Sequence, residues 1–206
     1  MNYDEFPEMT RGYLVVPEPN YLPEGHDDIY ERFCCAIYMA ACINSKTSLY
    51  IMPPYSASKA YLRASLAEFV SIEDALKLKC PAVYEDFSIV KSSNPLFHIM
   101  KLLRDYNIHL GVTTLLESEI PVALEAKPEE VHDIDTLIVN NLEVNSLMML
   151  RNSKHYSDSE LINMVDCFNI QQRRFGVADL IIRGLVMYSS HIKKILTKQS
   201  TGSSLR

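Results

Sequence analysis

Apolar residues recur every three or four positions over long stretches of the chain, which is the spacing of a helix that buries one face. Four helical segments are expected from this spacing, and they cover residues 27–44, 56–79, 95–110 and 158–198. In the second segment, Ser71 stands three residues before Asp74, a pattern that resembles a helix-capping box. The second helix is therefore expected either to continue through Ser71 or to bend and restart there.

Several residues mark the ends and bends of these helices. Asn94 followed by Pro95 is typical of a helix start, because asparagine caps the first turn and proline suits the first helical position. Gly111 permits the same helix to stop. Gly176 and Gly184 interrupt the last segment and indicate bends or close helix contacts, since glycine is unfavourable in a helix interior.

The stretch between the third and the last helix has a different pattern. Residues 112–126 are richer in β-branched side chains and alternate in part, so one or two short strands or an extended loop are expected there. Lys127 and Pro128 predict a turn or a helix start. Residues 134–140 predict a strand or a helical segment, and residues 142–150 predict a short helix.

These patterns predict a mainly α fold, a helical bundle of four to five helices with a small β or irregular insertion after the third long helix. Residues 1–26 are expected to form an extended N-terminal arm, because their four prolines oppose a regular helix. Residues 27–199 are expected to form the helical domain, with the insertion at about 112–150, and residues 200–206 a flexible tail.

The composition favours a cytoplasmic protein. No run of 18 apolar residues is present, which argues against a membrane span, and the acidic first residues argue against a secretory signal. The five cysteines are odd in number and include no Cys-x-x-Cys pair, so we expect buried free thiols in a reducing compartment. The six histidines do not cluster at zinc spacing, and no metal site is expected.

Charge is unevenly distributed along the chain. The net charge of −6 opposes non-specific binding to nucleic acid. Residues 1–150 contain eleven Lys/Arg and twenty-two Asp/Glu, a net charge of −11, whereas residues 151–206 contain nine and four, a net charge of +5. The basic C-terminal part is therefore either a local phosphate-binding face or an ordinary solvated helix surface.

The end of the third helix carries the residues best suited to chemistry, Arg104, Asp105 and His109. Arginine binds phosphate as a planar, permanently charged fork, and histidine can take or give a proton near neutral pH. In an ideal helix, however, Arg104 and His109 lie about 140° apart. To meet one phosphate, either the helix must end or distort near Asn107, or two copies of the chain must face each other across a two-fold axis.

The sequence Arg104-Asp105-Tyr106-Asn107-Ile108-His109 near the end of a third helix resembles the Arg-x4-His motif of the HEPN superfamily. The resemblance covers residues 27–110 and the long C-terminal helix. It implies a cofactor-free, metal-independent endoribonuclease that works as a homodimer, in a toxin–antitoxin or anti-phage defence setting with an antitoxin or defence-system partner protein. Arg104 would hold the scissile phosphate, His109 would act as general base or acid, and Asp105 would orient one of them.

Other interpretations of these residues remain open. Arg104 can be a structural arginine that pairs with Asp105 or Glu68, and His109 can simply cap its helix, where a cationic ring is favoured. Many HEPN-like domains act as binding modules, so the alternative function is a non-catalytic interaction or scaffold module of the same fold. An unrelated helical bundle with a fortuitous motif is the third possibility.

Two further basic groups are candidates for nucleic-acid binding. Lys154 and His155 precede the last helix, whose N-terminus favours anions. Arg173 and Arg174 form a basic turn within that helix, for which an ordinary surface helix is the alternative interpretation. The chain has no Gly-rich phosphate loop, no Gly-x-Ser-x-Gly elbow and no His-Glu-x-x-His pair. Nucleotide hydrolysis by those routes and zinc proteolysis are therefore excluded.

Overall fold

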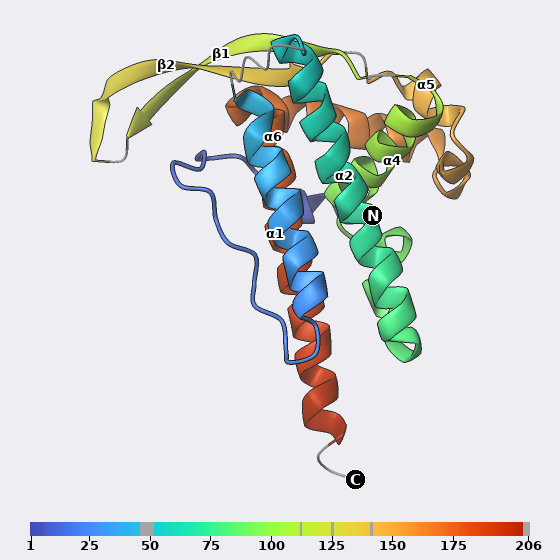
Figure 1. Ribbon diagram of the computed structural model, residues 1–206. Coiled ribbons are helices and arrows are strands. Elements are labelled where there is room, and N and C mark those ends of the chain that lie inside the picture. Colours follow the sequence, from blue (N-terminus) through green and yellow to red (C-terminus); the bar gives the residue numbers. More distant parts are fainter. Residues whose placement is uncertain (46–51, 112, 125, 141, 204–206) are drawn as a thin grey trace.

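The computed structural model describes residues 1–45, 52–111, 113–124, 126–140 and 142–203, and over these residues the fold is mainly α with one small antiparallel sheet (Figure 1). The helices are α1 (Asp27–Ala41), α2 (Pro54–Lys79), α3 (Tyr84–Phe87), α4 (Pro95–His109), α5 (Val144–Met148) and α6 (Asp158–Ser203), and the strands are β1 (Leu115–Leu124) and β2 (Lys127–Val139). The predicted mainly α class is confirmed. The described residues form six helices rather than the expected four to five. Two of them, α3 and α5, are shorter than two turns, and α3 was not predicted.

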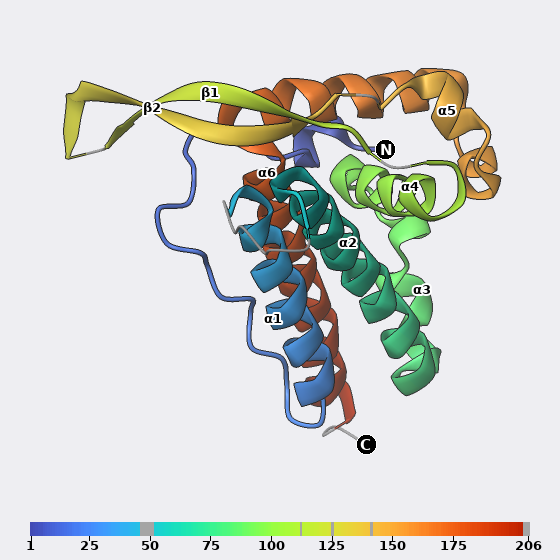
Figure 2. The same ribbon diagram turned by 45° about the horizontal axis from the view of Figure 1, so that its top comes forward.

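Helix α6 changes direction at Gly176, whose φ of 91° lies in the left-handed region that favours glycine. Its first half lies along one end of the bundle, and its second half runs beside α1 (Figure 2). A Cβ at residue 176 would collide with Oγ1 of Thr136, so this glycine also permits a close approach of strand and helix. The predicted bend at Gly176 is confirmed.

The other helix boundaries follow the sequence signals closely. Asn94 caps α4 by accepting a hydrogen bond from the N–H of Leu96 at 2.9 Å, and Pro95 is the first helical residue. Helix α2 continues without a break through Ser71, because Leu66, Phe69 and Leu76 bury one uninterrupted face. Of the two alternatives for this segment, continuation is therefore the observed one.

The core is formed where α1, α2, α4 and the second half of α6 meet. Tyr188 of α6 lies at the centre of an aromatic cluster, with ring centroids 5.9 Å from Phe33, 5.3 Å from Phe69 and 5.2 Å from Phe97. Its hydroxyl donates a hydrogen bond to the carbonyl of Phe87 at 2.9 Å, so the ring is fully buried without an unpaired polar atom. One side chain thus joins all four long helices.

Strands β1 and β2 form a long antiparallel hairpin that projects from the helical body (Figures 1 and 2). The expected strand near 112–126 is confirmed, and the segment 134–140 is a strand rather than a helix. The expectation of a turn or helix start at Lys127 was wrong, because β2 begins there, with Lys127 opposite Leu124.

The base of the hairpin is fixed to the body through the outer edge of β2. Gln172 of α6 accepts from the N–H of Val139 at 2.7 Å and donates to its carbonyl at 2.9 Å. Asn44 accepts from the N–H of Leu137 at 3.3 Å. Side chains therefore replace the missing neighbouring strand at the base, whereas residues 127–135 of β2 are exposed throughout.

Residues 1–26 lie against the helical body and contain one short 3-10 turn, Tyr3–Glu5. Met9 and Phe6 are buried in the core, and the N–H of Met9 donates to Gln171 of α6 at 2.7 Å. Further along, the N–H of Tyr13 donates to Asp179 at 2.9 Å. The arm therefore covers α6 on both sides of the Gly176 bend.

The five cysteines are free thiols, as expected, but the expectation that they are buried was wrong. Cys35 is exposed, and the other four are half-buried. Among the described residues, no helix combines the length and the apolar composition that crossing a bilayer requires.

Candidate functional site

Arg104 lies near the C-terminal end of α4 and forms an ion pair with the next residue. Its Nη1 contacts Oδ1 of Asp105 at 2.8 Å, with the carboxylate 5% exposed and the arginine side chain 29% exposed. Nε of Arg104 is buried and has no hydrogen-bond partner among the described residues. The guanidinium is thus held by a buried carboxylate while part of the side chain remains accessible to solvent.

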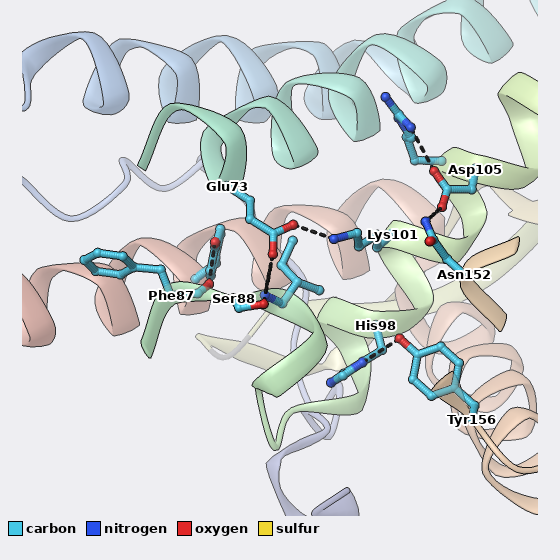
Figure 3. A network of polar contacts seen from close by, with 11 residues as sticks. Glu73, Phe87, Ser88, His98, Lys101, Asp105, Asn152 and Tyr156 are labelled. Carbon is cyan, nitrogen blue, oxygen red and sulfur yellow. Dashed lines mark hydrogen bonds and ion pairs between the residues drawn. The ribbon is translucent and has the colours of Figure 1, made fainter. Parts of the chain in front are cut away.

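Asp105 is itself held from the other side. Its Oδ2 accepts a hydrogen bond from Nδ2 of Asn152 at 2.5 Å (Figure 3). Asn152 belongs to the 3-10 helix η5 (Arg151–His155), so the basic segment before α6 packs against the end of α4. Because both carboxylate oxygens have partners, the orientation of Asp105 is fixed, and with it that of Arg104.

Asn152 is the functional candidate that sequence reasoning missed. The sequence marked the segment around it as basic, but the contact with Asp105 joins residues 47 positions apart. No helical or strand periodicity relates two residues at that separation. Only the packing of η5 on α4 reveals the contact.

His109 is the last residue of α4, and it is exposed. It makes no hydrogen bond or ion pair with any residue that the structure describes, and Asp105 contacts Arg104 and Asn152 instead of its ring. Arg104 and His109 therefore lie on the last turns of one helix without a direct link.

The helix does not distort to bring the two residues together. Asn107 donates from Nδ2 to the carbonyl of Leu103 at 2.8 Å and accepts at Oδ1 from the N–H of Thr113 at 3.0 Å, so it closes the end of α4 while the helix continues to His109. Of the alternatives for this helix, a distortion at Asn107 is therefore not observed, and α4 ends two residues later, at His109. The other arrangement considered for a shared phosphate, two copies of the chain facing each other across a two-fold axis, remains the basis for a proposal.

Two buried contacts beside this cluster fix α4 and η5 in place. His98 contacts Tyr156, and Glu73 contacts Lys101 at 2.5 Å (Figure 3). His98 also contacts the carbonyl of Ser92 at 2.8 Å. Burial lowers the pKa of His98 and raises the pKa of Tyr156, so the ring is neutral and the hydroxyl stays protonated near neutral pH. The region around Arg104 is therefore rigidly supported.

The remaining candidate residues do not form one patch. Lys154 and His155 are exposed on η5, close to Asn152. Arg173 and Arg174 are exposed near the Gly176 bend. At the rise of an ideal helix, Arg173 lies about 22 Å from Asp158, the first residue of α6. Arg174 also pairs with Glu8 of the arm at 3.0 Å. The structure thus separates the two basic groups and places only the first beside Arg104.

Two cavities in the described part of the chain lie away from these side chains. A cavity of about 1050 Å³ lies between the start of α4 and the second half of α6, and its lining includes Asn94, His191 and Lys194 but none of the candidate residues. Within the described ranges, no three His, Cys, Asp or Glu side chains gather closely enough to hold a metal ion.

Comparisons with known proteins give no relative of this chain. No protein-family model matches it, and neither a curated protein nor a solved structure matches it.

Proposed function

We propose that this protein is a HEPN-like, metal-independent endoribonuclease whose active site forms between two copies of the chain. The observation that carries the proposal is the Arg104–Asp105–Asn152 arrangement. A buried carboxylate, with a partner at each of its two oxygens, holds a partly exposed arginine in one orientation. This arginine lies five residues before an exposed histidine on the same helix. A pre-oriented guanidinium is suited to binding a phosphate whose charge increases in the transition state.

The reaction would use the 2′-hydroxyl of the RNA as nucleophile. His109 takes the proton from this hydroxyl, the 2′-oxygen attacks phosphorus, and the bond from phosphorus to the 5′-oxygen breaks. The leaving oxygen takes up a proton, either from the second copy's imidazolium or from water. The products are a 2′,3′-cyclic phosphate and a 5′-hydroxyl, and Arg104 stabilises the charge on the non-bridging oxygens.

The surroundings of the site assign roles to the other candidate residues. Asp105 positions Arg104 and does not touch the substrate. Lys154 and His155 would bind the RNA backbone on one side, and Arg173 and Arg174 would reach it only along a longer substrate. Such an activity fits a cytoplasmic toxin or anti-phage protein that an antitoxin or another defence component restrains.

Substitution of the two central residues tests this proposal. Arg104→Ala and His109→Ala should each reduce cleavage of a mixed RNA by at least about 100-fold, because each removes a group that acts in the transition state. Arg63→Ala, which removes an exposed arginine from α2, is the matched control and should cleave like the wild type. Cleavage by both Arg104→Ala and His109→Ala at the wild-type rate would disprove the proposed active site.

The second candidate function is a non-catalytic interaction module, and the hairpin favours it. Residues 117–135 contain seven Asp/Glu and one Lys, a net charge of −6 that equals the charge of the whole chain. Such a projecting acidic surface repels RNA and favours a basic protein. On this account the wild type would not cleave RNA, and replacing Glu119 and Asp133 with Asn or Gln would weaken protein binding rather than RNA cleavage.

A further inference from the structure

One cysteine of the chain lies beside a histidine. Sγ of Cys80 is 3.5 Å from Nε2 of His26, within hydrogen-bond distance for sulfur. Cys80 follows the last residue of α2, and His26 precedes the first residue of α1, so the contact joins adjacent ends of two antiparallel helices. No hydrogen bond between a histidine and Cys34, Cys35, Cys42 or Cys167 is present in the described part of the chain.

The opposite nitrogen of the ring fixes the tautomer of His26. Nδ1 lies 3.2 Å from the carbonyl of Pro23 and 3.3 Å from the carbonyl of Glu24. Because a carbonyl can only accept, Nδ1 carries a proton, so in the neutral form of the ring Nε2 presents its lone pair to the thiol. Gly25, with a φ of 88°, makes the turn in which the ring folds back onto these carbonyls.

The thiol needs such a base in order to react. Burial is the largest influence on the pKa of Cys80 and raises it, while the nearby charge of Lys79 opposes this effect. Lys79 also pairs with Asp28, which holds the same two helix ends together. A thiol that rests protonated becomes a nucleophile when an adjacent imidazole takes its proton, and a backbone-oriented histidine at hydrogen-bond distance is the arrangement that does this.

We propose that Cys80 and His26 form a base-assisted reactive thiol, which small peroxides oxidise in preference to the other cysteines. With hydrogen peroxide, Sγ attacks one oxygen, a sulfur–oxygen bond forms and the oxygen–oxygen bond breaks. His26 takes the thiol proton and passes it to the departing hydroxide. The products are cysteine sulfenic acid and water, so atoms and electrons balance, and the peroxide is the oxidant.

Alkylation of the native protein by iodoacetamide tests this proposal, with each cysteine-containing peptide quantified by mass spectrometry over time. Cys80 should react several-fold faster than Cys35, even though Cys35 is the more exposed thiol. His26→Asn should lower the rate at Cys80 about tenfold relative to Cys35 at pH 7, because asparagine can still donate to the same carbonyls but is not a base. The same change should reduce dimedone-trapped sulfenic acid at Cys80 after peroxide treatment.

His191→Asn is the matched control, because His191 also contacts a backbone carbonyl, that of Asp86 at 2.9 Å, but has no cysteine partner. This substitution should leave the ratio of the alkylation rates of Cys80 and Cys35 unchanged. The ratio is measured within one sample, so a general loosening of the fold by His26→Asn would raise both rates and would not imitate the expected result. A Cys80 to Cys35 ratio below one in the wild type, or a ratio that His26→Asn leaves unchanged, would overturn the proposal.

Discussion

Tyr156 donates a hydrogen bond from its hydroxyl to Nδ1 of His98 at 2.8 Å, and the two rings meet edge-on with centroids 5.4 Å apart. Nε2 of His98 must then carry the ring proton, which it donates to the carbonyl of Ser92 at 2.8 Å. This contact joins α4 to the segment just after η5. It therefore supports the same packing that brings Asn152 to Asp105.

Tyr156→Phe should lower the free energy of unfolding by about 1–3 kcal/mol, since it leaves a buried ring nitrogen without a donor. Urea unfolding at pH 7.5 measures this change. Tyr21→Phe, which removes an exposed hydroxyl, is the control and should cost far less. Equal stability of the two variants would show that the buried hydrogen bond contributes nothing.

The buried position of His98 predicts a pH dependence of stability. Burial lowers the pKa of His98 in the folded protein below its ordinary value of about 6.5. Between these two pKa values the unfolded chain binds more protons at this site than the folded chain, so the free energy of unfolding rises with pH through this window. The contribution of His98 to the free energy of unfolding is complete above about pH 6.5, the pKa of histidine in the unfolded chain. It is lost as the pH falls through the lowered pKa of His98 in the folded protein.

Unfolding measured at several pH values between 5 and 7.5 tests this dependence. His98→Gln should flatten the rise, because the titrating ring is gone. His132→Gln, on the exposed hairpin, should leave the rise intact. An identical pH profile for wild type and His98→Gln would contradict the account.

The ion pair of Glu73 and Lys101 predicts a large loss of stability when one partner is removed. The Glu73 carboxylate is 3% exposed and also accepts from the N–H of Ile89 at 2.8 Å. Lys101→Met should therefore cost about 3 kcal/mol or more, because it leaves a buried charge unpaired. Lys127→Met, which breaks the exposed pair with Glu130, should cost less than about 1 kcal/mol.

Gly176→Ala should destabilise the protein more than Gly25→Ala. Both glycines have a positive φ, of 91° and 88°, so both changes introduce backbone strain. Only residue 176 also lacks room, because its Cβ would collide with Thr136, whereas a Cβ at residue 25 meets nothing within 4 Å. Thr136→Ala should recover part of the loss in the Gly176→Ala background but not in the Gly25→Ala background, as thermal melts of the four variants would show.

Local signals in the sequence were enough to predict the long helices, although not the short helix α3. Asn94 and Pro95 mark the start of α4, and Gly176 marks the bend in α6, because capping and glycine conformation depend on a few neighbouring residues. The first part of strand β2, from Lys127, was missed for the opposite reason. Its proline and charges favour a turn, and only pairing with β1 makes it a strand.

The candidate site was only partly predictable. The motif identified Arg104, Asp105 and His109, and the pairing of Arg104 with Asp105 had been one of the alternatives for that arginine. The partner of Asp105, Asn152, and the contact between Cys80 and His26 each join elements distant in the sequence. Such contacts depend on how the helices pack, and a single sequence contains no periodic signal for them.

Incubation of a mixed RNA with the purified protein in EDTA, followed by analysis of the new RNA ends, is the most direct test of the central claim. We expect 2′,3′-cyclic phosphate and 5′-hydroxyl ends with the wild type, and no new ends with His109→Ala. Cleavage that leaves a 3′-hydroxyl and a 5′-phosphate, or cleavage that His109→Ala performs as well as the wild type, would contradict it.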